Sequence, residues 1–318
     1  MSDKYELYLG YNANFLTPDT IDLPQLSDKQ QQDMAPVVNT TDQVARYMNY
    51  SLIISKKRRF PYFTASNIDG IKFKKVVRDD HWRKDDRISP DHQWGNELYK
   101  VPGSDFDKGH MTKREDTQWG DTIALAQLAA DSTFHYTNAV PQHAMLNQRV
   151  WRSLEDYILH TETVDNGLAI NVFTGPVLDK KDPIFISPVK GENVPIPYLF
   201  WKIVYFRKSD TKLYRVGFLM SQYSLLWDNG IVKEPLLEAK RSVEDDNLFM
   251  QFKDADTYQV SVSTIEKLSK LTFPHAVEPF TDDRKISLIL KEVDVEKLTR
   301  ESSSPIVQLG FSIVGLEL

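Results

Sequence analysis

One segment of the chain reads Gly103-Ser104-Asp105-Phe106-Asp107-Lys108-Gly109-His110-Met111, and it places a histidine directly after a glycine. Glycine has no side chain, so the backbone beside His110 can come close to a ligand. A neutral imidazole, with an ordinary pKa near ~6.5, can take a proton from water at pH 7. His110 is therefore a candidate general base, although a lone histidine in a sequence is more often structural than catalytic.

The next informative segment runs from 134 to 142 with the sequence FHYTNAVPQ. Asn138 lies in it shortly before Pro141, and we expect a turn here that leads into a helix. Apolar residues then recur every four positions, which predicts a helix over 143–160 with one apolar stripe. The stripe consists of Leu146, Val150, Leu154 and Ile158.

Asn147 lies in the first turns of that predicted helix. Asparagine is a poor helix-interior residue because its side chain competes for backbone hydrogen bonds. Its amide therefore either serves a ligand or bonds to a neighbouring loop, and this segment alone favours neither. Asn147, Trp151 and Glu155 share one helix face, but eight residues rise about 12 Å along the axis. Glu155 would thus reach an ion at Asn147 through a water, and Trp151 is more simply a core residue.

Three pieces of the chain together resemble the DNA/RNA non-specific endonuclease family. They are D-K-G-H at 107–110, T-N-A-V-P-Q at 137–142, and N-Q-x-x-W-x-x-L-E beginning at Asn147. The family signature is D-R-G-H, then an S/T-N-x-x-P-Q turn, then an N-Q-x-x-W-x-x-L-E helix. The pieces occur in this order with the family spacing, and the likeness is densest from about Tyr50 to Phe218. Each piece alone is weak, but three with matching spacing are specific.

The resemblance implies a ββα-metal fold, in which a hairpin carries His110 and a helix carries Asn147. It implies a hydrolase that cuts phosphodiester bonds of both DNA and RNA and leaves 5′-phosphate ends. No 2′-hydroxyl is needed for that chemistry, which permits both substrates. It also implies one Mg²⁺ or Mn²⁺ with Asn147 as the sole direct protein ligand and water elsewhere. Glu155 and Asn138 would then position hydration waters and the active-site loop.

Lys108, Arg114 and Arg152 are the candidate phosphate-binding residues. Lys108 stands where the family has arginine, which keeps the charge but loses the planar fork that grips two oxygens. Leu159 stands where some members carry an arginine, four residues after the helix glutamate. Charge in the transition state must therefore be met by another residue, and the sequence leaves both Arg152 and Arg114 open.

Charge and composition restrict the partners. The 318 residues carry a net charge of −6, which argues mildly against nucleic acid, but phosphates respond to local clusters. One basic cluster covers 56–59. Another, mixed with acidic residues, covers 72–87 and fits a solvated surface and a phosphate site equally well. Cysteine is absent, so any metal must be held by oxygen or imidazole, as Mg²⁺, Ca²⁺ and Mn²⁺ permit.

The organisation along the chain predicts the α+β class with a central, mainly antiparallel sheet flanked by helices. Residues 1–45 are expected to form an N-terminal extension packed on the surface, and 46–318 a single nuclease domain with a C-terminal strand and helix elaboration. Strands and helices occur in mixed order rather than as βαβ units. Strands are expected at 50–55, 61–66, 168–173, 198–206 and 213–220, and helices at 122–131, 236–240 and 263–271.

The remaining expectations concern location, partners and rival functions. The first residues lack the pattern of a signal peptide, so we expect a cytoplasmic protein with no membrane association. Relatives are often dimers, which makes a homodimer an expectation, and a nuclease inside a cell needs an inhibitor or regulatory partner. One rival is an inactive nucleic-acid-binding protein on the same fold. Others are a different hydrolase, whose usual motifs we do not find, and an interaction protein.

Overall fold

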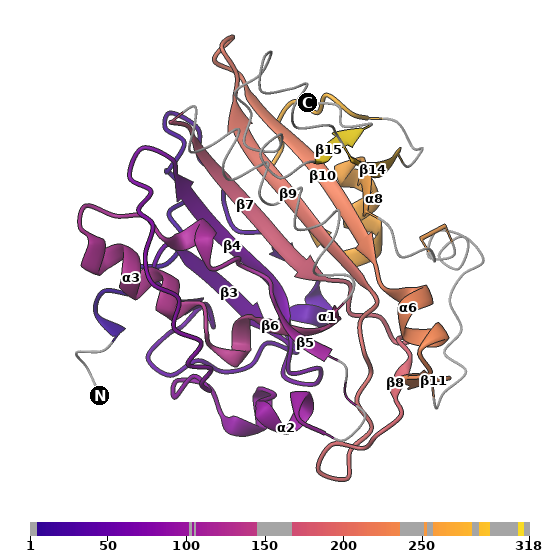
Figure 1. The fold of residues 1–318 in the computed structure, drawn as a ribbon. Helices are drawn as coiled ribbons and strands as arrows, with labels where there is room; N and C mark the ends of the chain where they lie inside the picture. The colour runs from indigo at the N-terminus through magenta and orange to yellow at the C-terminus, as the bar shows by residue number, and fades with distance from the viewer. Residues whose placement is uncertain are drawn as a thin grey trace.

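The computed structural model describes residues 5–101, 104, 106–144, 167–235, 251–252, 257–281, 286–292 and 311–314. Within these ranges nine strands form one antiparallel sheet in the order β15-β14-β12-β10-β9-β7-β4-β3-β2 (Figure 1). Their bounds are β2 (Ala45–Arg46), β3 (Tyr50–Ile54), β4 (Pro61–Asp69), β7 (Ala169–Pro176), β9 (Leu199–Arg207), β10 (Leu213–Ser221), β12 (Thr257–Val260), β14 (Ile286–Glu292) and β15 (Phe311–Val314).

Shorter elements surround this sheet. Three strand pairs lie outside it: β1 (Gln25–Leu26) with β13 (Leu271–Thr272), β8 (Ile184–Phe185) with β11 (Val232–Lys233), and β5 (Phe106–His110) with β6 (Ala139–His143). The helices are α1 (Asp28–Gln31), α2 (Asn96–Tyr99), α3 (Ile123–Ser132), α6 (Tyr223–Asp228) and α8 (Val262–Ser269). Single 3₁₀ turns are η2 (Pro90–His92), η3 (Glu115–Thr117) and η4 (Tyr136–Asn138). None of the described helices has the length and apolar character needed to cross a membrane.

The central strands are buried on both faces. β9 and β10 read LFWKIVYFR and LYRVGFLMS, and most of their residues are enclosed. A near-continuous apolar run is typical of a strand covered on both sides. The lysine in β9, Lys202, is tolerated inside because its Nζ donates to Thr174 Oγ1 at 3.2 Å.

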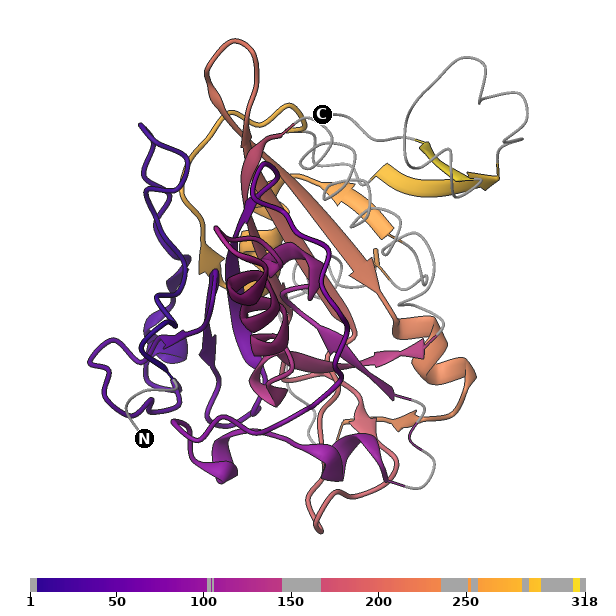
Figure 2. The ribbon, with the colours of Figure 1, turned by 60° about the vertical axis from the view of Figure 1, so that its left-hand side comes forward.

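The pairing of residues across the sheet shows which elements pack on each face, because residues directly opposite one another point to the same side. Gly217 of β10 lies in the same cross-strand row as Ser51 of β3. A Cβ on Gly217 would lie 2.9 Å from Ile265, so α8 packs on this face. The N-terminal segment covers it too, because the Tyr11 amide donates to Ser51 Oγ. Figure 2 shows this N-terminal segment with α1 along one side of the sheet.

The opposite face carries α3 and the β5–β6 pair (Figure 1). Tyr50 points to this face, and its hydroxyl donates to the carbonyl oxygen of Ser132 at the end of α3. The helix begins where the Thr122 side chain accepts from the Leu125 amide, an N-cap of the usual kind. Helix α3 therefore holds the elements that follow it against the sheet.

The expected α+β class and the mainly antiparallel sheet are confirmed. The five predicted strands are present as β3, β4, β7, β9 and β10, and two predicted helices as α3 and α8. The predicted helices at 143–160 and 236–240 lie outside the described residues, apart from the short start of the first. Residues of the expected N-terminal extension, Leu16 and Ile21, are buried in the main core.

Candidate active site

The β5–β6 pair presents the D-K-G-H segment. His110 lies opposite Ala139, and Gly109 lies opposite Val140. A Cβ added to Gly109 would lie 2.2 Å from Cδ of Gln142. Only glycine therefore lets β5 approach the buried Gln142 side chain as closely as it does, and this approach places His110 at the end of β5.

Asn138 fixes the chain just beyond that end. Its Oδ1 accepts from the Thr112 amide at 2.9 Å. Its Nδ2 donates to the carbonyl oxygens of Thr112 at 2.9 Å and Thr133 at 3.1 Å. The side chain is fully buried, and both amide hydrogens are used on the backbone. These contacts suit positioning of the loop after His110 rather than direct contact with a substrate.

The His110 ring is held between aromatic rings. Its centroid lies 4.7 Å from that of Trp82 in a tilted arrangement. It lies 5.1 Å from that of Phe134, edge to face. The residue keeps some solvent contact, but its Nε2 is enclosed and has no hydrogen-bond partner among the described residues.

The surroundings keep this imidazole neutral. Burial of the ring is the largest cause that lowers the pKa of His110, to about 3, and the Arg78 charge is the next. Arg114 and Lys108 act in the same direction, while Asp80 opposes them. A neutral ring can accept a proton, so at pH 7 His110 is in the form that a general base needs.

Lys108 and Arg78 bring positive charge to the same place. The Lys108 Nζ lies 5.6 Å from the Trp82 ring centroid and 5.9 Å from that of Tyr99. Burial, followed by the charge of Lys100, lowers the pKa of Lys108. The Arg78 side chain is 63% exposed, its Nε donates to Asp80 Oδ1 at 2.7 Å, and its Cζ lies 5.9 Å from the Phe134 centroid.

Arg114 is more enclosed than Arg78. Its side chain is 13% exposed, and its Nη1 donates to Gln118 Oε1 at 3.1 Å. Its Nη2 lies 3.6 Å from Glu115 Oε1. A neutral imidazole surrounded by cations of different exposure is suited to receive a phosphodiester.

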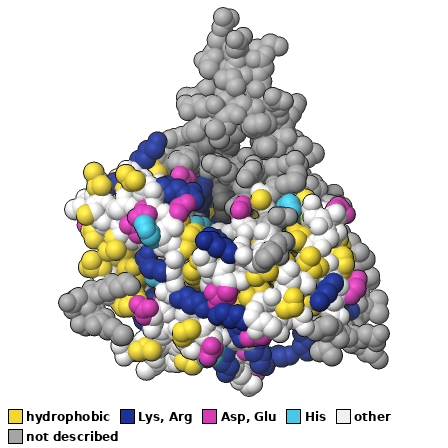
Figure 3. Space-filling model, turned by 60° about the horizontal axis from the view of Figure 1, so that its bottom comes forward, with side chains coloured by type: hydrophobic (Ala, Val, Ile, Leu, Met, Phe, Trp, Pro, Cys, Tyr) yellow, Lys and Arg dark blue, Asp and Glu magenta, His cyan; other side chains and the backbone are white. Residues whose placement is uncertain are grey.

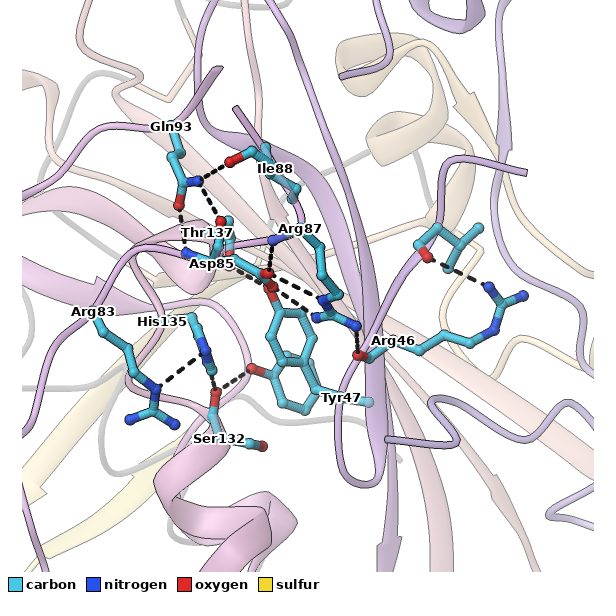
Figure 4. A network of polar contacts seen from close by, with 12 residues as sticks. Arg46, Tyr47, Arg83, Asp85, Arg87, Ile88, Gln93, Ser132, His135 and Thr137 are labelled. Atoms are coloured by element: carbon cyan, nitrogen blue, oxygen red, sulfur yellow. Dashed lines mark hydrogen bonds and ion pairs between the residues drawn. The ribbon is translucent and has the colours of Figure 1, made fainter. Parts of the chain in front are cut away.

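A buried polar network anchors the segment that leads away from Trp82 (Figure 4). The Tyr47 hydroxyl donates to Asp85 Oδ2 at 2.5 Å and contacts Thr137 Oγ1 at 2.7 Å. Arg87 donates to both carboxylate oxygens of Asp85, from Nε at 3.0 Å and from Nη2 at 2.7 Å. The network therefore ties residues 85–87 to η4, which also contains Asn138.

A second histidine, His135, belongs to this support and not to the chemistry. Its Nδ1 lies 2.7 Å from the Ser132 carbonyl oxygen, and its Nε2 accepts from Arg83 Nε at 3.2 Å. Burial and the charge of Arg83 lower the pKa of His135 to about 4. Both ring nitrogens are thus occupied by structural contacts.

The structure places four of the seven predicted site residues close together, and it places the segment around Trp82 beside them. His110, Lys108 and Arg114 share one electrostatic environment, and Asn138 holds the loop behind them. Asn147, Arg152 and Glu155 lie outside the described residues. Among the described residues no group of three His, Asp or Glu side chains could hold a metal ion.

Sequence reasoning did not assign roles to Arg78, Asp80 and Trp82. All three lie in the mixed-charge cluster at 72–87, where a tryptophan among alternating charges was the available signal. On the face shown in Figure 3, Lys and Arg side chains gather in several groups with Asp and Glu between them. The local basic groups therefore exist despite the negative net charge.

The chain is similar to several known proteins. A family model described as DNA/RNA non-specific endonuclease matches residues 30–280. An uncharacterized protein of Sinorhizobium fredii, y4fB, is 34% identical over 230 residues, which is 69% of this chain and 33% of that protein. The chain thus spans about a third of that relative's length.

A solved structure shares the fold. The crystal structure of the EndoG/EndoGI complex, on the mechanism of EndoG inhibition, aligns with a TM-score of 0.51 at 22% identity. The alignment covers 72% of this chain and 84% of that one. At this identity the likeness supports the fold alone.

Proposed function

The chain belongs to the DNA/RNA non-specific endonuclease family, and we propose that it is a divalent-metal-dependent endonuclease that hydrolyses phosphodiester bonds in DNA and RNA. The bond cut is that between phosphorus and the 3′-oxygen, which leaves 5′-phosphate ends. The observation that supports this most is the neutral His110 imidazole at the end of β5, beside Lys108, Arg78 and Arg114. A general base and a phosphate-binding set occur there in one place.

His110 would take a proton from the attacking water as the new phosphorus–oxygen bond forms. Its neutral state makes that transfer available at pH 7. Asn138 would act as a positioning residue, because its three hydrogen bonds fix the loop that follows His110. Glu155, by its place in the family motif, would position hydration waters of the metal ion.

Positive side chains would hold the phosphate. Arg78 is the most exposed of those near His110, and within the described part of the chain its Nε alone makes a hydrogen bond or ion pair. Its two Nη groups can therefore meet phosphate oxygens. Lys108 would add a point charge from the same strand as His110. Arg114 would add a largely enclosed charge, and Arg152 remains a further candidate.

Asn147 would hold one Mg²⁺ or Mn²⁺, which supplies stabilisation of negative charge on the phosphate and on the leaving oxygen. The charges with the largest effect on His110 are those of one carboxylate, Asp80, and three cations. Such a set does not compete with Asn147 for a divalent ion. A single amide ligand also suits Mg²⁺, which keeps several waters.

The rival function is an inactive nucleic-acid-binding protein on the same fold. Incubation of the purified chain with plasmid DNA and with RNA, in Mg²⁺ and in chelator, distinguishes the two. We expect nicked and linear plasmid and shortened RNA only with the metal, and products that a ligase joins without prior phosphorylation. Binding without cleavage at any Mg²⁺ or Mn²⁺ concentration would favour the rival.

A regulatory partner is also proposed for this chain. An active nuclease inside a cell endangers the cell's own nucleic acid, so a protein inhibitor or assembly into a homodimer would be needed for control. Sedimentation of the purified chain, alone and after capture from its host, tests both. A monomer that retains full activity in host extract would count against them.

A further inference from the structure

Trp82 lies in an extended segment that belongs to no described helix or strand, yet its place is fixed. The next residue, Arg83, forms a bridge with His135, just before η4: its amide donates to the Phe134 carbonyl at 3.0 Å, and its carbonyl accepts from the Tyr136 amide at 2.9 Å. The Trp82 ring then packs on those of Phe134 at 5.3 Å and Tyr136 at 5.6 Å between centroids. Backbone and ring contacts together hold the indole.

That indole touches two residues of the D-K-G-H segment. It lies 4.7 Å from the His110 ring and 5.6 Å from the Lys108 ammonium. Lys108 and His110 are two apart on β5, so their side chains share one face of the strand. Trp82 covers that face across both.

On the Nε2 side of the His110 ring, packing rather than a hydrogen bond within the described residues fixes the orientation. Its enclosed Nε2 has no hydrogen-bond partner there, so no carboxylate or carbonyl fixes the ring from that side. Phe134 meets the ring edge to face, and Trp82 meets it at an interplanar angle of 51°. Aromatic contacts of this kind stabilise the ring's position beyond the effect of the area that they bury.

We propose that Trp82 is a positioning residue of this site, whose indole holds the His110 imidazole and the Lys108 ammonium in a fixed relation to one phosphodiester. This proposal rests on the proposed function for its catalytic consequence, but the contact itself can be measured without substrate. A base displaced by about 1 Å can lose about 10²-fold in rate, which is the scale expected when the indole is removed.

The same contact keeps water from the ring. The charged groups with the largest effect on His110 are Arg78, Arg114 and Lys108, which disfavour its protonation, and Asp80, which favours it. Loss of the indole would admit water and screen all four. Because burial is the largest cause of the lowered pKa, that pKa would then rise toward its ordinary value. The acid limb of the rate profile would move to higher pH.

The experiment compares Trp82→Phe with Trp82→Leu and Trp82→Met. Phenylalanine keeps a ring, whereas leucine and methionine keep apolar volume without one. Trp227→Leu is the matched control, because Trp227 of α6 is likewise partly buried and packs on an aromatic ring, that of Tyr223 at 6.0 Å. For each folded variant, kcat, KM and the pH profile of kcat/KM are measured, and the His110 ring resonance, assigned with His110→Gln, is titrated by NMR.

We expect Trp82→Phe to retain its rate within about threefold, and Leu and Met to lose about 10²-fold in kcat, with the His110 titration moved upward. KM should rise in the same two variants through Lys108, and Trp227→Leu should change none of these. A Leu or Met variant with the wild-type titration and pH profile would overturn the proposal. If the wild type cuts nothing, the proposed function fails, and the NMR titration alone still decides whether Trp82 holds His110.

Discussion

The side-chain amide of Asn138 satisfies both backbone polar groups of Thr112, accepting from its N–H and donating to its carbonyl oxygen, each at 2.9 Å. The Asn138 carbonyl also accepts from the Met111 amide at 2.9 Å. One asparagine therefore replaces a strand partner for the two residues that follow His110. The position of His110, the proposed general base, depends on this contact as well as on β5.

Asn138→Ala should lower both stability and activity. The substitution leaves three buried backbone groups without partners, and each such group costs about 1–3 kcal/mol. Some of this will be recovered by water, so we expect a loss of about 2–4 kcal/mol in the free energy of unfolding. Urea denaturation measures it. Asn229→Ala is the control, because its side chain makes one exposed hydrogen bond to Leu225; equal losses in the two variants would contradict the assignment.

Lys108→Arg should retain or raise activity. The guanidinium restores the fork that grips two phosphate oxygens, and it can stack on Trp82 and Tyr99, over which the ammonium now lies. Any gain should appear in turnover or salt tolerance rather than encounter rate, since the charge is unchanged. Lower activity would mean that the aromatic surroundings fit only lysine.

Lys108→Ala, measured at two salt concentrations, gives the matching control. Loss of one phosphate contact should reduce the slope of log affinity on log salt by about 1. Wild-type kinetics at both salts would show that Lys108 is a solvated surface residue.

Asn147→Ala should weaken metal dependence more than substrate binding. Asn147 is the proposed direct protein ligand, so the Mg²⁺ concentration for half-maximal rate should rise, and high Mg²⁺ should restore part of the rate. Titration of activity against Mg²⁺ at saturating DNA measures this. An unchanged metal titration, or a metal found on carboxylates elsewhere, would defeat the assignment.

Stability should depend on acid pH through two histidines. The folded-state pKa values of His110 and His135 are lowered from 6.5 to about 3 and about 4. Between these folded-state values and pH 6.5, the unfolded chain binds more protons than the folded one, so the free energy of unfolding rises with pH. The stability that depends on these two neutral imidazoles is fully present above pH 6.5 and is lost progressively as pH falls from 6.5 toward the folded-state pKa values. Melting temperatures at pH 7 and pH 5 test this, and His135→Gln should flatten the difference between them.

Local sequence patterns predicted the long strands because β9 and β10 are almost continuously apolar, and runs of that kind are typical of buried strands. The pairs β1–β13 and β8–β11 could not be predicted. Each strand has only two residues, which is too short to show a period. Their pairing also joins segments far apart in the chain.

The site was predictable in its motif residues and not in its surroundings. His110 and Asn138 lie in segments whose order and spacing match the family signature. Trp82 precedes His110 by 28 positions, and their contact depends on how Arg83 pairs with His135 and its neighbours. A local sequence pattern cannot predict a pairing between segments so far apart. The charged run around Trp82 therefore fitted a solvated surface and a phosphate site equally well.

The rate of Mg²⁺-dependent plasmid cleavage by His110→Ala and His110→Gln, compared with the wild type, tests the central claim most directly. Loss of a general base typically costs about 10²–10⁴-fold, so we expect both variants to fall by that factor. DNA binding in chelator and melting temperature should stay near the wild-type values, and should do so more closely in the glutamine variant, which fills more of the space between Trp82 and Phe134. A folded variant that binds DNA and keeps most of the wild-type rate would remove His110 from the mechanism.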